Sequence, residues 1–281
     1  MSLTAVPPEQ LVPADKPQPV RSLAANRWVV LACRLAAIAV VLGLWQHFAG
    51  GPSAVLPTDA ISKPSSIFIA FWHLVANGLI FQATWYTALS VIIGLPVSAV
   101  LGGILAALTA RPKGRWVFQP LVSLGYAVPK VGLIQLFILY FGLHRKVELA
   151  IIVSSVSFIY YFALRQAWEE LNPDVYAALR LMRAGRLKIL ITFVLPSAVP
   201  QLFAATRIGL PLALATEIFA EIVVGQDSSL GHLVSLYTLT SNSGGAMAVL
   251  LFVSLLGYLI DIGLDAGLRR YGDSVGLGGN Q

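Results

Sequence analysis

The sequence predicts an all-α, polytopic membrane protein with six transmembrane helices and both termini in the cytoplasm. Hydrophobic residues make up 57% of the 281 positions and charged residues only 11%, with a mean hydropathy of +0.78. A soluble domain carries about 25% charged residues, so this composition indicates an integral membrane protein. The single cysteine, Cys33, excludes an intramolecular disulfide and a cysteine-cluster metal site.

Apolar runs long enough to cross a bilayer account for the predicted spans. About 20 helical residues rise through the ~30 Å hydrocarbon core. Before the first run, residues 1–26 are rich in proline and polar residues and predict a disordered cytoplasmic tail. One transmembrane domain is expected over 27–270, followed by a flexible tail over 271–281. An amphipathic helix is expected over 65–79. The predicted spans are 28–49, 83–110, 117–143, 149–164, 197–224 and 246–268.

The distribution of lysine and arginine gives the orientation, because cytoplasmic loops carry an excess of these residues. With the N-terminus in the cytoplasm, only Lys63, Arg145 and Lys146 fall outside, and Lys130 and Arg207 lie within spans. The remaining fourteen of the nineteen are cytoplasmic: Lys16, Arg21, Arg27, Arg34, Arg111, Lys113, Arg115, Arg165, Arg180, Arg183, Arg186, Lys188, Arg269 and Arg270.

A basic stretch, NPDVYAALRLMRAGRLKILITFVLP over 172–196, lies between the fourth and fifth predicted spans. Its periodicity predicts an amphipathic helix over 176–189, which Asn172 or Asp174 would cap. A basic stripe is formed by arginines three residues apart, and the apolar face by residues at helical spacing. Such a helix either lies on anionic lipid headgroups or docks into a groove on a soluble partner. The stripe is Arg180, Arg183 and Arg186; the apolar face is Ala178, Leu181, Met182, Gly185 and Ile189.

This stretch resembles the cytoplasmic loop of bacterial ABC importer permeases, in which Glu-Ala-Ala is followed by a glycine and then by Leu-Pro. The flanking segments VPKVGLIQLFILYFGL and ATRIGLPLALATEIFAEIVVGQDSSLGHLV resemble the nitrate/sulfonate/taurine subfamily, and the resemblance covers about 56–271. Ala177 stands where the family has glutamate, and Arg183 where it has glycine. The resemblance implies these ATPase-coupling residues: Ala177, Ala178, Arg180, Leu181, Arg183, Gly185, Leu195 and Pro196.

The resemblance also implies a set of partners in a bacterial inner membrane. These are membrane lipid, two ABC ATPase subunits that bind ATP and Mg, a second copy of the permease or a paralogue, and an extracytoplasmic substrate-binding protein. The sequence has no G-x-x-x-x-G-K-[ST] phosphate loop, no H-E-x-x-H and no G-x-S-x-G, so we expect no catalytic residue, metal or cofactor in this chain. Nucleic acid is not an expected partner. The rival function is an ion-coupled carrier or membrane enzyme that acts without an ATPase.

Ionisable residues within the predicted spans are candidates for the translocation path, since each costs roughly 2.5–3.5 kcal/mol to insert. Lys130, after the bend expected at Pro129, either attracts an anion in the pore or serves as a structural lysine. Arg207 lies near mid-membrane and falls in a segment that resembles the family. Glu217 and Glu221, one helical turn apart, either pair with Lys130 or Arg207 or gate the outer mouth.

Two further features concern the last span and the segment before it. Asp261 and Asp265 are four residues apart, and we expect them to be solvated or paired with lysine or arginine rather than to form a proton relay. Residues 225–245 are either a polar connection or, as the resemblance implies, a short external helix at the mouth. The resemblance implies a small anionic substrate such as nitrate, a sulfonate or taurine.

Overall fold

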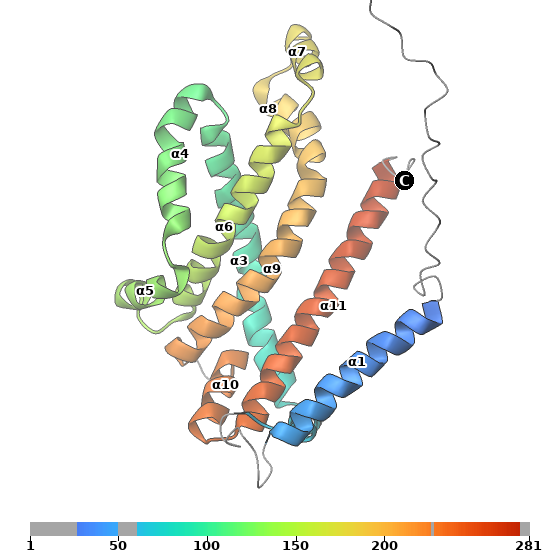
Figure 1. Cartoon of the computed structure of the whole chain (residues 1–281). Coiled ribbons are helices and arrows are strands. Elements are labelled where there is room, and N and C mark those ends of the chain that lie inside the picture. The colour runs from blue at the N-terminus through green and yellow to red at the C-terminus, as the bar shows by residue number, and fades with distance from the viewer. Residues whose placement is uncertain (1–26, 50–60, 226–227, 276–281) are drawn as a thin grey trace, which may run out of the picture.

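The computed structural model describes residues 27–49, 61–225 and 228–275, and these form helices joined by short connections (Figure 1). The all-α prediction is confirmed. A 3-10 turn at Lys130–Gly132 precedes α5, and a π-helical turn at Leu190–Val194 precedes α9. The helices are α1 Arg27–Phe48, α2 Pro64–Ala76, α3 Leu79–Thr109, α4 Pro112–Ala127, α5 Leu133–Phe141, α6 Arg145–Glu169, α7 Pro173–Leu181, α8 Arg186–Ile189, α9 Leu195–Val224, α10 Leu230–Leu239 and α11 Ser243–Val275.

Four helices of the described chain are long and apolar enough to cross a membrane: α1, α3, α6 and α11. The pair formed by α4 and Lys130–Phe141, bent by 79°, counts as a fifth span if it is taken together. The 30-residue α9 is long enough as well, but Arg207, Glu217 and Glu221 lower its hydropathy. A multi-pass membrane protein is therefore confirmed, and the count of six spans remains a prediction in which α9 is the sixth crossing.

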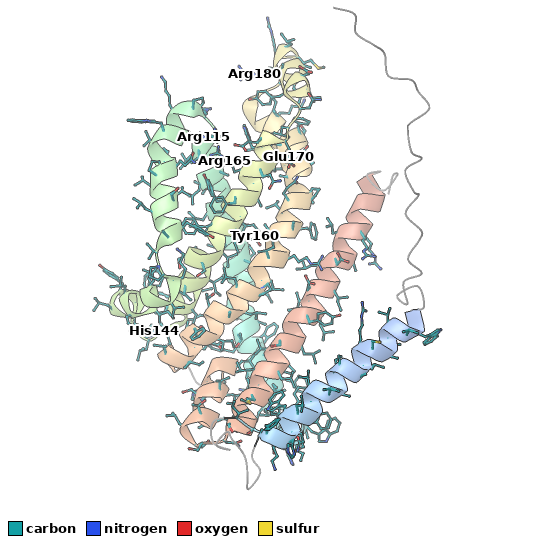
Figure 2. All side chains as sticks on the ribbon, in the orientation of Figure 1. Arg115, His144, Tyr160, Arg165, Glu170 and Arg180 are labelled. Carbon is teal, nitrogen blue, oxygen red and sulfur yellow. The ribbon has the colours of Figure 1, made fainter. Side chains whose placement is uncertain are left out.

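The centre of the bundle is α6, which packs between α3 and α9 (Figure 1). Ile152 and Val156 of α6 are fully buried in a cluster that includes Val91 of α3 and Leu210 of α9. The Tyr160 hydroxyl, labelled midway along the bundle in Figure 2, lies 2.8 Å from the Thr206 hydroxyl of α9. One end of the bundle carries α7 and the other carries α10, so α6 and α9 connect the two ends.

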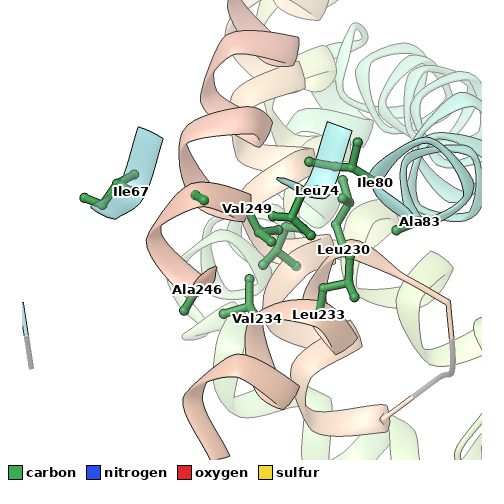
Figure 3. Close-up of a cluster of buried hydrophobic side chains, with 11 residues drawn as sticks. Ile67, Leu74, Ile80, Ala83, Leu230, Leu233, Val234, Ala246 and Val249 are labelled. Atoms are coloured by element: carbon green, nitrogen blue, oxygen red, sulfur yellow. The ribbon is translucent and has the colours of Figure 1, made fainter. Parts of the chain in front are cut away.

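A second buried cluster closes the end that carries α10 (Figure 3). Ile67 and Leu74 of α2, Leu230 and Val234 of α10, and Val249 of α11 come together there. The expected amphipathic helix over 65–79 is therefore α2, which ends at Ala76. The short helix expected within 225–245 is α10, rather than an irregular polar connection, and its external placement remains a prediction.

Several predicted boundaries are wrong because tertiary contacts extend the helices. The fourth span was expected over 149–164, but α6 runs over Arg145–Glu169, so Glu148 and Arg165 are helical rather than parts of loops. One prediction in this region is confirmed. The third span bends sharply after Val128, as expected, because Pro129 lacks the N–H that would continue the helix. The helix α11 continues to Val275, past the expected end at 268, whereas 1–26 and 276–281 lie outside the described residues.

The contact between α3 and α6 depends on Gly102. A Cβ at this position would lie 2.6 Å from the Ser157 carbonyl oxygen and 2.8 Å from the Tyr161 backbone nitrogen, both on α6. The next residue, Gly103, has room, since its Cβ would meet only the Leu164 Cδ1 at 3.5 Å. Small residues let membrane helices approach closely. Of these two glycines, Gly102 is the one that the close approach of α3 to α6 requires.

We therefore expect Gly102→Ala to separate α3 from α6 and to lower the free energy of unfolding by about 1–3 kcal/mol. Thermal unfolding of the purified protein in detergent measures this loss. The matched control is Gly103→Ala, which adds the same methyl group one residue away and should leave the melting temperature unchanged. Equal melting temperatures for the two variants would contradict the assignment.

Candidate coupling surface and intramembrane charges

The helix α7 begins where its sequence predicts. The Asn172 side chain caps it, with Oδ1 accepting from the Asp174 amide at 2.9 Å and from the Val175 amide at 3.5 Å. Proline is well placed in the first turn, where an N–H would have no helical acceptor. Of the two expected caps, Asn172 is the one observed, while Asp174 lies in the first turn and complements the helix dipole.

The same helix ends earlier than predicted, at Leu181, and the reason lies at Arg183. The Ala184 amide donates to the Leu179 carbonyl at 3.1 Å and the Arg183 amide to the Arg180 carbonyl at 3.0 Å, the hydrogen bonds of a Schellman cap. That cap requires a left-handed residue, and Arg183 adopts φ +56°. A continuous helix over 176–189 with a single arginine stripe is therefore wrong. Glycine suits this position best, and it is the residue found there in the motif that this stretch resembles.

An exposed apolar surface covers the outer side of α7. Leu181 is 84% exposed, Met182 is 78% exposed, and Ala178 is also exposed. We call these three residues the tip surface, since α7 lies at the extreme end of the bundle (Figure 1). Ile189, which was predicted to share this face, is buried instead (3% exposed), because α8 turns it back toward the bundle.

The other predicted coupling residues lie on α7, in the turn after it and at the start of α9. Ala177 is exposed on α7 beside Ala178, and a Cβ at Gly185 would meet no atom within 4 Å. Leu195 and Pro196 form the start of α9 and are exposed. Arg180 points to a different region, a cavity beneath α7 that is lined in part by Tyr176. The structure therefore places Arg180 on the inner side of α7 and the tip surface on the outer side.

Lys130 holds the bend in the third predicted span. Its ammonium group donates to the carbonyl oxygens of Gly125 at 2.5 Å, Val128 at 2.9 Å and Tyr126 at 3.1 Å, and lies 4.8 Å from the Phe158 ring centroid. These carbonyls lack helical donors because α4 ends at Ala127, just before Pro129. All three ammonium hydrogens thus have acceptors, a structural arrangement that differs from the expected pairing with a carboxylate.

Arg207 joins α9 to α11. Its guanidinium contacts both carboxylate oxygens of Asp261, Nε–Oδ1 at 2.6 Å and Nη2–Oδ2 at 3.0 Å, and its Nη1 lies 3.1 Å from Asp265 Oδ1. Arg269 pairs with the second oxygen of Asp265 at 2.8 Å. The expectation of arginine-paired aspartates is confirmed. The expectation that Arg207 or Lys130 pairs with Glu217 or Glu221 is wrong, since both cations have other partners.

Glu221 attaches α10 to the bundle. Its carboxylate accepts from the Thr87 hydroxyl of α3 at 2.6 Å and from the Gly231 amide at 2.7 Å, and the Thr87 oxygen accepts from the Leu230 amide at 3.2 Å. A Cβ at Gly231 would lie 2.5 Å from the Glu221 Cβ, so this approach requires glycine. The carboxylate thus occupies the positive N-terminal end of α10.

Two further carboxylates are buried beside Glu221, and the sequence had indicated only one of them. Glu217 is fully buried, and neither carboxylate oxygen has a hydrogen-bond partner among the described residues. Glu148 is also fully buried and accepts from the Ser90 hydroxyl at 3.3 Å. The fourth predicted span begins at 149, so the sequence leaves Glu148 in the turn before it. The apolar residues on both sides of it, in KVELAII, are the signal that would have identified it as buried.

The left-handed conformation of Arg183 leads to a prediction for α7. We expect Arg183→Gly to remove a cost of about 1 kcal/mol, so that the Ala184 amide exchanges with solvent roughly fivefold more slowly. Hydrogen exchange resolved by mass spectrometry measures this. In the matched variant Arg180→Gly, the glycine enters the helix itself, and exchange should become faster. A change of the same sign in both variants would show that the cap does not limit α7.

The contacts of Glu221 lead to a second prediction, for α10. We expect Glu221→Ala to leave the Gly231 amide buried without its acceptor, at a cost of about 1–3 kcal/mol. Amide exchange in Leu230–Leu239 should therefore accelerate by roughly 10–100-fold, while the isosteric Glu217→Gln leaves it unchanged. Equal protection of α10 in the wild type and in Glu221→Ala would contradict the role of this carboxylate.

Comparison with known proteins agrees with this architecture. The family described as "Binding-protein-dependent transport system inner membrane component" matches residues 98–272, more than half of the chain. The riboflavin transport system permease of Chloroflexus aurantiacus is 28% identical over 246 residues, 81% of this chain and 84% of that one. An aliphatic sulfonates transport permease of Bacillus subtilis is 23% identical (79% and 80% covered). The taurine transport system permease of Escherichia coli is 22% identical (64% and 63% covered).

Two solved structures share the fold. A chain of the MetNI methionine ABC transporter in an inward-facing conformation superposes with a TM-score of 0.53 at 19% identity, covering 75% of this chain and 99% of that one. A bacterial ABC transporter involved in import of the polysaccharide alginate gives a TM-score of 0.59 at 17% identity, with 86% and 96% covered. With the match over 98–272, these findings show that the chain belongs to the binding-protein-dependent transport system inner membrane components, the permease subunits of ABC importers.

Proposed function

We propose that this permease couples ATP hydrolysis by a separate ATPase to the uptake of a small sulfonate-like anion, and that the tip surface is the contact with the ATPase. The observation that carries the proposal is the exposure of Leu181 and Met182 at the end of the bundle. Burying a leucine or methionine side chain against a partner contributes about 1.5–3 kcal/mol relative to leaving it exposed. A hydrophobic groove on a soluble partner would therefore gain substantially by covering these residues.

The connections of α7 make it suited to transmit a movement. It lies between α6 and α9, whose adjacent ends are joined by a hydrogen bond from Gln201 Nε2 to Glu170 Oε2 at 2.9 Å. At the far end of α9, Glu221 holds the first turn of α10, and midway Arg207 holds α11. A displacement of α7 therefore reaches α10 through one continuous helix.

The proposed substrate class follows from the sulfonate and taurine permeases among the relatives. A flavin-like aromatic solute is the second candidate, because the riboflavin permease of C. aurantiacus has the higher identity, 28%. The contacts of Arg207 and Lys130 bear on this choice, since carboxylates and carbonyl oxygens already neutralise or occupy both cations. Recognition of an anion would then rest with the substrate-binding protein more than with these two side chains.

The test is ATP-dependent uptake in proteoliposomes that contain the permease, its ATPase and its substrate-binding protein. We expect uptake of labelled taurine or an alkanesulfonate, and loss of at least tenfold in Leu181→Asp and Ala178→Asp, because each places a charge in an apolar contact. Co-purification of the ATPase should fall in parallel. Leu239→Asp is the matched control, since Leu239 is 82% exposed at the opposite end, on α10.

Three outcomes would contradict parts of the proposal. Unchanged ATPase association in both α7 variants would remove the tip surface as the contact. Uptake of riboflavin without uptake of sulfonates would show that the substrate is the second candidate, a flavin-like aromatic solute. Uptake that persists in the absence of any ATPase and follows a proton gradient would support an ion-coupled carrier.

A further inference from the structure

A cavity of about 930 Å³ lies beneath α7, at the same end of the bundle as the tip surface but facing inward. Its walls are the last turn of α3, the first turn of α4, the end of α6 and the inner side of α7. Figure 2 shows Arg180, which lines it, at the end of the molecule where Arg115, Arg165 and Glu170 also lie.

Three cationic side chains line this cavity: Arg111, Lys113 and Arg180. None of the three makes an ion pair with a described carboxylate. The two glutamates at the end of α6 are engaged elsewhere, Glu169 with Arg165 at 2.8 Å and Arg115 at 3.3 Å, and Glu170 with Gln166 and Gln201. Among the described residues that line the cavity, none carries a carboxylate. The cavity therefore holds positive charge that the surrounding chain does not neutralise.

The first turn of α4 adds a fixed positive end to this cavity. Pro112 begins the helix, so the amides of Lys113 and Gly114 are among those without a helical acceptor. Gly114 packs directly on α3, because a Cβ there would overlap the Leu108 carbonyl oxygen. This contact fixes the turn, and with it Arg111 and Lys113, against the end of α3. Helix N-termini of this kind favour phosphate groups.

The rest of the lining is apolar or aromatic. Trp168 and Tyr176 face the cavity from α6 and α7, and Ile189 and Val194 close it from the segment before α9. Aromatic residues of this kind sit at the level of lipid headgroups, and basic pockets between membrane helices bind anionic ones. A soluble anion would gain nothing from the apolar walls. A phospholipid matches both parts of the lining, its headgroup the basic residues and its acyl chains the apolar ones.

We propose that this cavity binds the phosphate headgroup of an anionic phospholipid, held by Arg111, Lys113 and Arg180 and by the first turn of α4. The bound headgroup bridges α4 and α7, because Arg180 comes from one helix and Arg111 and Lys113 from the other. The bound lipid thereby stabilises the position of α7 through a contact on its inner side, while the tip surface on its outer side stays exposed.

The experiment measures lipid binding to the purified full chain by native mass spectrometry, with phosphatidylglycerol, phosphatidylcholine and inorganic phosphate added separately. The wild type should retain phosphatidylglycerol in preference to phosphatidylcholine. The variant Arg111→Gln/Lys113→Gln/Arg180→Gln should bind phosphatidylglycerol roughly 100-fold more weakly, since each basic side chain near a headgroup contributes about a factor of five.

The matched control is Arg34→Gln/Lys188→Gln/Arg270→Gln, which removes the same charge from residues that do not line the cavity. It should bind phosphatidylglycerol as the wild type does. Equal weakening of phosphatidylglycerol binding in both triple variants would show that the binding depends only on general surface charge, and this would overturn the site. Displacement of phosphatidylglycerol by inorganic phosphate alone would assign the site to a soluble anion. Unchanged binding of phosphatidylglycerol in the first variant would overturn the site.

Discussion

The close approach of α6 to its two neighbours is the constraint on which the rest of this structure depends. Glycines allow it on both sides: a Cβ at Gly94 or Gly102 of α3, or at Gly209 of α9, would lie within 2.8 Å of an α6 atom. Lipid is as apolar as the helix surfaces, so association in a membrane relies on such packing rather than on the hydrophobic effect. With α6 fixed between α3 and α9, both ends of the bundle are placed relative to each other.

Polar contacts then specify which helices pack against one another. The pairs made by Arg207 attach α11 to α9, the Glu221 carboxylate attaches α10, and Lys130 stabilises the bend after α4. Each of these groups would be costly in hydrocarbon without its partners, so each restricts which helices can lie together. The buried carboxylate of Glu217 differs from these groups, because neither of its oxygens has a hydrogen-bond partner among the described residues.

The loop motif departs from the family pattern at two positions, and the structure explains how the chain accommodates one of them. The family's glycine corresponds to Arg183, and the backbone there keeps the left-handed conformation of a Schellman cap without it. The fold therefore imposes the turn, and the chain tolerates the cost of a side chain. The missing glutamate, at Ala177, leaves the outer side of α7 more apolar. The division of α7 into an apolar outer side and a basic inner side separates the tip surface from the basic cavity.

The sequence by itself determined the class of fold, the positions of most spans, a helix cap at Asn172 or Asp174 and the bend at Pro129. These follow from composition, from local periodicity and from proline, each of which acts within one or two helical turns. Only the tertiary structure decided that Arg207 pairs with Asp261, that Glu148 is buried and that Arg111 and Arg180 share a cavity. These pairings join residues more than 50 positions apart, and helix spacing does not specify which faces meet. The left-handed turn at Arg183 belongs to the same group, because an arginine gives no local signal for it.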